Sequence, residues 1–134
     1  MLGVSSYAKD YVGACRAQVA AQLASYRKML AAKPSGIDAF ERQFLNHMIL
    51  ALDHYFMHRL RNREGKDGNP LNEVRMLCNA IMENKDRMSA DKSIRYKPDM
   101  SILKFRDGDE IRLHADDFAR LSAAFFDEIE KKYP

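Results

Sequence analysis

The sequence predicts a mainly α fold, a four-helix bundle-like domain with a small β-hairpin before the last helix. Apolar residues recur at spacings of three and four along most of the 134 residues, as they do in amphipathic helices. Clusters of Pro, Gly, Asn and Asp divide the chain into segments of helix length. Only over residues 101–113 does the spacing change to short alternating runs around an Asp-Gly pair, which is typical of a hairpin. We expect a single domain over residues 1–134.

The first helix is expected over residues 6–32, a segment rich in Ala, Gln, Leu and Arg, which are good helix formers. Pro34 and Gly36 then interrupt the pattern, because proline cannot continue a helix and glycine favours turns. The apolar stripe of this helix consists of Val12, Cys15, Val19, Leu23, Tyr26 and Leu30.

The second helix is expected over residues 37–64. Its start offers two capping-box arrangements, Ser35 with Asp38 or Asp38 with Glu41, and the sequence does not choose between them. Arginines fill its last turns and Gly65 follows as a natural end. Apolar side chains cover more than half of the circumference, which is typical of a helix at the centre of a bundle or at a subunit contact.

Asn69 followed by Pro70 reads as an N-cap and first helical residue, so the third helix is expected over residues 70–88. The hairpin of residues 101–113 follows. The last helix, over residues 115–132, carries two aspartates in its first turn, where they suit the helix dipole. The predicted core includes Phe44, Met48, Leu52, Val74, Ile81, Phe118, Leu121 and Phe125.

Composition and charge exclude several classes of protein. The net charge of +3 is small and the basic residues alternate with acidic ones, so no nucleic-acid partner is expected. No apolar run approaches the length of a membrane-spanning helix, and no export signal is visible. We therefore expect a cytoplasmic protein with no membrane partner. Cys15 and Cys78 form no paired motif and are interpreted as reduced, buried thiols.

Three of the four histidines lie in the stretch HMILALDHYFMH, residues 47–58. On one helix, His54 and His58 would lie about 6 Å apart along the axis, whereas His47 would lie about 10 Å from His54. His54 and His58 are therefore the candidate metal ligands, although no HExxH or paired ExxH pattern accompanies them. The favoured interpretation is structural, with no cofactor; a transition-metal site and a proton-transfer role are the alternatives.

The stretch HRLRNREGKDGNPLNEVR, residues 58–75, concentrates polar groups where two predicted helices meet. A helix N-terminus with arginines nearby can bind an anion. The favoured interpretation of this stretch is a solvated structural loop. An anion site and a contact with another chain are the two alternatives. The candidate ligand-binding residues for a small anion are Arg61, Arg63, Lys66, Asn69 and Arg75.

Three segments, EGKDGNPLNEVR, ADKSIRYKP and GDEIRLHADDFARL, resemble small uncharacterised helical proteins of actinobacteria. The resemblance covers roughly the latter two-thirds of the chain. It implies a self-contained bacterial protein of the cytosol. Because these proteins are uncharacterised, the resemblance assigns no activity, cofactor or partner.

No catalytic signature is present: the serines lack a GxSxG context, and paired aspartates are explained by a helix start and a turn. Whether the protein is an enzyme stays open, with a non-catalytic role favoured. The leading hypothesis is a protein-interaction module that self-associates as a homodimer, because the second predicted helix is apolar around most of its circumference. The alternative is a bundle that binds a metal at His54 and His58 or a small anion at the arginine-rich loop.

Overall fold

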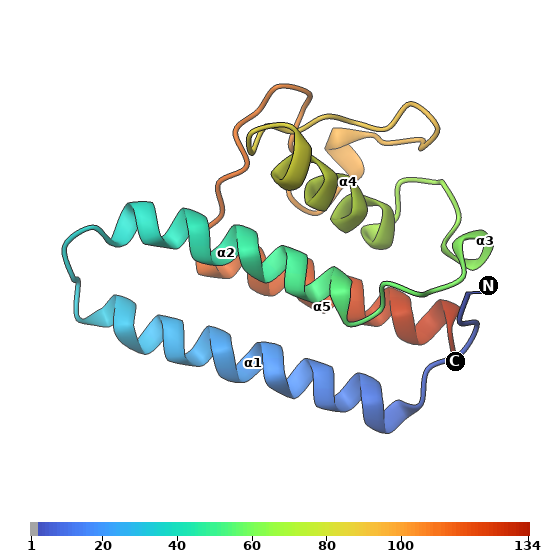
Figure 1. Ribbon diagram of the computed structural model, residues 1–134, viewed down its shortest axis with the longest axis horizontal. Helices are drawn as coiled ribbons and strands as arrows, with labels where there is room; N and C mark the ends of the chain where they lie inside the picture. Colours follow the sequence, from blue (N-terminus) through green and yellow to red (C-terminus); the bar gives the residue numbers. More distant parts are fainter. Residues whose placement is uncertain (1–2) are drawn as a thin grey trace.

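The computed structural model describes residues 3–134 and is mainly helical, with 61% of residues in helices, as the sequence predicts. Helices α1 (Lys9–Ala31), α2 (Ile37–His54) and α5 (Ala115–Lys132) lie roughly alongside one another, and α5 packs against both others (Figure 1). Helix α4 (Pro70–Glu83) covers the opposite side of α2 and α5. Two single turns, α3 (Arg61–Glu64) and the 3₁₀ helix η1 (Pro98–Met100), lie in the connections.

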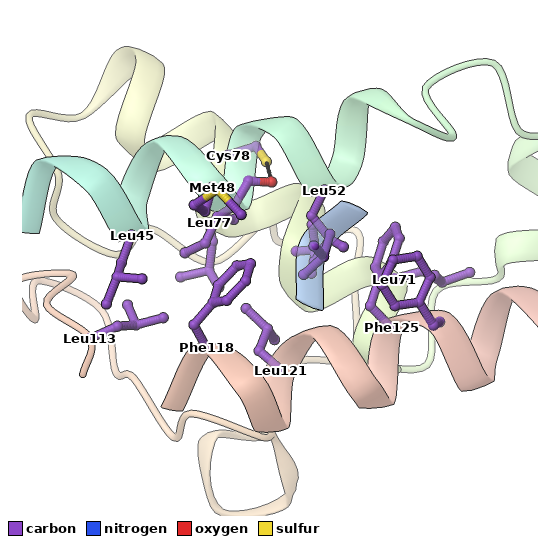
Figure 2. Packing of buried hydrophobic residues seen from close by; sticks show 14 of the residues in the cluster. Leu45, Met48, Leu52, Leu71, Leu77, Cys78, Leu113, Phe118, Leu121 and Phe125 are labelled. Carbon is purple, nitrogen blue, oxygen red and sulfur yellow. Dashed lines mark hydrogen bonds between the residues drawn. The ribbon is translucent and has the colours of Figure 1, made fainter. Parts of the chain in front are cut away.

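The core lies between α2, α4 and α5, where leucine and phenylalanine side chains interdigitate (Figure 2). Six of the eight predicted core residues are buried, and Phe44 and Ile81 are partly buried at its edge. Cys15 and Cys78 are buried free thiols, and Cys78 donates to the Ile49 carbonyl oxygen at 3.6 Å. The buried predicted residues are Met48, Leu52, Val74, Phe118, Leu121 and Phe125.

The start of α2 forms neither of the two capping boxes predicted for the second helix. The N-cap of α2 is Gly36, with φ of 73°, and no side chain caps the helix. A positive φ is readily adopted by glycine and disfavoured for other residues. Gly36 therefore sets the direction in which the chain enters α2. The predicted capping boxes, Ser35 with Asp38 and Asp38 with Glu41, are wrong.

The second helix ends ten residues earlier than expected, at His54, and only the short α3 follows within the predicted range. The backbone beyond His54 is bonded to the N-terminal segment: Val4 N–H donates to the His58 carbonyl, and Leu60 N–H donates to the Val4 carbonyl. A residue whose backbone pairs with a distant segment cannot also complete the helical ladder. The prediction of a continuous helix over residues 37–64 is therefore wrong beyond His54.

The predicted hairpin over residues 101–113 is also wrong, since strand pairing involves only about 3% of residues. The N–H groups of Ile102 and Leu103 donate to the carboxylate of Glu73 at 2.8 and 2.9 Å, so they are not available to a partner strand. The turn at residues 106–109 does form, but the segment after it bonds to residues 86–88 instead, through Arg87 and Glu110.

The two ends of the described chain meet beside α3 (Figure 1). Tyr7 N–H donates to the Tyr133 carbonyl at 3.0 Å, and the Ser6 hydroxyl donates to the Pro134 carbonyl at 2.7 Å. The Tyr133 hydroxyl donates to the Leu60 carbonyl at 2.8 Å. These bonds join the first, middle and last segments of the chain at one end of the bundle.

Candidate functional site

The histidine pair does not lie on one helix. His54 is the last residue of α2, and His58 lies in the turn beyond it. Both are exposed and line the same hollow of about 460 Å³, together with Tyr7 and Tyr11, whereas His47 lies elsewhere on α2. Within residues 3–134, no group of three or more His, Cys, Asp or Glu side chains is arranged to hold a metal ion. Metal binding by His54 and His58 stays a prediction, and it would require further ligands.

Asn69 caps α4 as predicted. Its side-chain oxygen accepts hydrogen bonds from the backbone N–H groups of Leu71 and Asn72 at 2.9 and 3.2 Å. Its amide nitrogen donates to the Glu64 carbonyl at 2.8 Å. Two of the N–H groups that an anion at this helix start would need are thus already satisfied within the chain.

Arg75 belongs to a buried ion cluster that we define as Arg59, Glu64 and Arg75. Glu64 and the Arg59 side chain are fully buried, and Glu64 Oε1 lies 2.8 Å from Arg59 Nε and 2.7 Å from Arg75 Nη2. The amide of Asn72 adds a hydrogen bond to Glu64 Oε2 at 2.9 Å. Burial alone would raise the pKa of the Glu64 carboxyl, but the bonds and charges of Arg75 and Arg59 outweigh it and lower this pKa to about 2.

The other three candidate anion ligands stay at the surface. Arg61, Arg63 and Lys66 are exposed, and Arg63 Nη1 donates to the Lys132 carbonyl at 3.4 Å. The structure therefore places Arg75 beside Glu64 and Asn69 at the start of α4. The three surface cations lie outside the ion cluster. Anion binding by this loop stays a prediction.

The sequence does not indicate the burial of Arg59 and Glu64, which look like ordinary polar residues near a helix end. Their burial depends on Asn72 and Arg75, which lie eight and eleven residues beyond Glu64, and on the turn that ends α2. A buried charge requires a paired and hydrogen-bonded partner, and the partner's place is fixed by tertiary packing. No local pattern would have indicated it.

An apolar groove of about 410 Å³ lies between α1 and α2, on the other side of the molecule from α4. The rings of Tyr26, Phe40 and Phe44 form a stack along it, with centroids 5.1 to 6.3 Å apart. Phe40 is 43% exposed and Met29 is 40% exposed. We call this feature the α1–α2 groove; its lining is completed by Ala21, Gln22, Ser25 and Met48.

A polar chain, buried at Tyr26 and Glu41 and exposed at His114, lies beside the α1–α2 groove. The Tyr26 hydroxyl donates to Glu41 Oε2 at 2.8 Å, and His114 Nδ1 lies 3.1 Å from Glu41 Oε1. Burial, together with the neighbouring Glu41 carboxylate, raises the pKa of the Tyr26 hydroxyl. Tyr26 therefore remains a neutral donor, and this chain connects α1, α2 and the start of α5.

The chain matches no protein-family model, no curated protein and no solved structure. The resemblance to actinobacterial proteins rests on the three segments alone. Along residues 3–134, none of the helices is both long and apolar enough to span a bilayer. The geometry of the α1–α2 groove and of the polar clusters is what indicates function.

Proposed function

We propose that this protein is a non-catalytic interaction module that self-associates through the α1–α2 groove as a two-fold symmetric dimer. The observation that carries the proposal is the stack of Tyr26, Phe40 and Phe44, which leaves Phe40 43% exposed beside an apolar hollow. Large contiguous apolar patches on a folded protein mark binding surfaces, whereas scattered apolar residues do not.

The outer surface of α1 supports the same interface. The chain carries no charged residue between Arg16 and Arg27, although much of that stretch is exposed. A solvated helix normally exposes charged side chains, and small side chains allow a second helix to approach closely. The exposed residues of this stretch are Ala17, Gln18, Ala20, Ala21, Ala24 and Ser25.

A second copy is the occupant that fits this surface, because the protrusion and the hollow lie on the same face. In a two-fold interface each patch contacts the same patch of its partner, so one surface must supply both shapes. Phe40 and Met29 are exposed at the rim, and Ala21 and Ser25 of α1 line the hollow. The aromatic stack would then be shielded from water in both copies.

Analytical ultracentrifugation of wild type and Phe40→Glu tests the proposal. Position 40 lies in the first turns of α2, where a negative side chain suits the helix dipole, so the variant is expected to fold. Wild type should be dimeric at micromolar concentration, and Phe40→Glu should weaken dimerisation by a factor of roughly one hundred, about 2.7 kcal/mol. Met100→Glu is the matched control, because Met100 is 79% exposed outside the α1–α2 groove.

Two outcomes would overturn the dimer. Wild type could sediment as a monomer across the micromolar range, or Phe40→Glu could dimerise as strongly as wild type. Met100→Glu should sediment like wild type, and a loss of dimer in that control would move the interface away from the groove.

A second candidate function is metal binding, because His54 and His58 line one hollow. Elemental analysis of purified protein should then find near-stoichiometric zinc, iron or another transition metal, and His58→Ala should lose it. Metal-free protein whose melting temperature is unaffected by added zinc would exclude this function.

A further inference from the structure

A second hollow, of about 540 Å³, lies on another face of α2, between this helix, the end of α4 and the segment around Arg112. It differs from the α1–α2 groove in being lined by charged and amide side chains. The residues that matter here are Asp38, Arg42, Asn46, Ile81, Asp86 and Arg112. We call it the α2–α4 hollow.

Asn46 is the buried polar residue of the α2–α4 hollow, only 3% exposed. Its amide nitrogen donates to the Ile111 carbonyl at 3.2 Å and approaches Asp86 Oδ1 at 3.5 Å. Both neighbours are acceptors, so the orientation of the amide is determined by its hydrogen bonds. The side-chain oxygen is buried and accepts no hydrogen bond from residues 3–134. A buried acceptor without a donor is unfavourable, and a ligand with an N–H group would satisfy it.

Charges of both signs surround this acceptor. Arg42 lies 2.5 Å from Glu110 Oε1 and 3.8 Å from Asp86 Oδ2, and Arg112 lies 3.1 Å from the same Glu110 oxygen. A guanidinium has five N–H donors, so each arginine retains donors beyond these contacts. Their side chains are 31% and 51% exposed, which leaves them accessible to a ligand.

We propose that the α2–α4 hollow binds a small zwitterion, a free α-amino acid. The ammonium group would donate to Asn46 Oδ1 and pair with the Asp86 carboxylate, and the ligand carboxylate would pair with Arg42 and Arg112. Ile81 offers an apolar contact to the ligand side chain. A simple anion would meet the carboxylates of Asp38 and Asp86, and a simple cation would meet two guanidiniums. Only a ligand with both charges matches the whole lining.

This site is independent of the proposed dimer, because it uses different residues of α2. The groove uses Phe40, Phe44 and Met48, whereas the hollow uses Asp38, Arg42 and Asn46. Loss of dimerisation in Phe40→Glu should therefore leave ligand binding in place.

NMR titration of ¹⁵N-labelled protein with each of the twenty common L-amino acids, up to about 10 mM, tests the proposal. At least one amino acid should give saturable shifts of the Asn46 side-chain amide and of backbone amides around Arg42, Asp86 and Arg112. Its N-acetyl and C-terminal amide derivatives should each bind at least about tenfold more weakly, because each lacks one of the two charges.

Arg112→Gln should weaken binding of that amino acid at least about tenfold through loss of a carboxylate partner. Arg106→Gln is the matched control, since Arg106 is 64% exposed and pairs with Asp99 outside the hollow; it should bind like wild type. The proposal is overturned if none of the twenty shifts the Asn46 amide. It is also overturned if the derivatives bind as well as the parent, or if Arg112→Gln binds as well as wild type.

Discussion

The two ends of the helical bundle use polar and apolar side chains in opposite ways. Beside α3, the ion cluster of Arg59, Glu64 and Arg75 is placed inside the protein and hydrogen-bonded. Along α1 and α2, the aromatic ring of Phe40 and the Met29 side chain are left in contact with water. Buried charges determine where chain segments meet, because a buried charged side chain is stable only beside its oppositely charged partner. Apolar groups outside contribute little to the folded monomer, and the proposed dimer would bury them.

The largest expected effect is from Glu64→Gln in the ion cluster. The substitution removes the carboxylate that pairs with Arg75 and that, together with Asp53 at 2.9 Å, pairs with the fully buried Arg59. Breaking a buried pair on one side costs about 3–5 kcal/mol. We expect the free energy of unfolding, measured by denaturant titration, to fall by that amount. Asp99→Asn, at an exposed ion pair with Arg106, should change it by less than about 0.5 kcal/mol. Equal effects of the two variants would mean that the cluster does not hold this end of the bundle.

Acidification should lower the free energy of unfolding by protonating Glu64 in the same ion cluster. The pKa of Glu64 is lowered to about 2 in the folded protein, whereas an unfolded glutamate has a pKa of about 4.3. Its stabilisation is therefore fully present above about pH 4.5 and is lost as the pH falls toward 2, roughly 3 kcal/mol in total.

Unfolding free energies measured between about pH 6 and pH 2.5 should thus fall more steeply for wild type than for Glu64→Gln. Asp67 and Glu110, whose pKa values are also lowered, titrate in both proteins and cancel in the comparison. Parallel pH profiles for the two proteins would contradict the role given to Glu64.

An intermediate effect is expected from Tyr26→Phe, which keeps the ring of the aromatic stack and removes its hydroxyl. The lost hydrogen bond reaches the buried carboxylate of Glu41, and a bond to a charged group contributes about 1.5–3 kcal/mol. Tyr11→Phe is the control: its hydroxyl donates to a backbone carbonyl, that of Tyr55, at an exposed position. Thermal and denaturant unfolding should rank Tyr26→Phe as clearly the less stable variant.

The smallest effect on the folded monomer is expected at the groove. Phe40→Glu should change the unfolding free energy of dilute, monomeric protein by no more than about 1 kcal/mol, as for most surface substitutions. The melting temperature of wild type should rise with protein concentration, because dimerisation stabilises the folded state by mass action. That of Phe40→Glu should not. A wild-type melting temperature that does not change with protein concentration would contradict the proposed dimer.

Elements determined by local pattern were predicted well from the sequence. The sequence predicts the last helix over residues 115–132, and α5 occupies those residues, because its acidic first turn and regular apolar spacing lie within the helix itself. Asn69 was expected to cap α4 and does so. In both cases the deciding contacts lie within a few residues of each other in the chain.

Elements determined by distant partners were not predicted. The end of α2 depends on Val4, the loss of the hairpin depends on Glu73, and the burial of Arg59 depends on Arg75 through Glu64. The charge pattern near residue 60 looked like a solvated helix end, since sequence spacing gives no measure of tertiary burial. The apolar second helix predicts a subunit contact, but the sequence does not predict the α1–α2 groove itself.

The hydrogen bonds that join the two ends of the chain also have a mechanical consequence. Tyr7 and Ser6 bond to Tyr133 and Pro134 side by side, so a force that pulls residues 6 and 134 apart loads these bonds one after another. Bonds loaded in sequence part at lower force than bonds loaded together. The bundle should therefore peel open from this end under tension, and the ion cluster behind it would set the next barrier to extension.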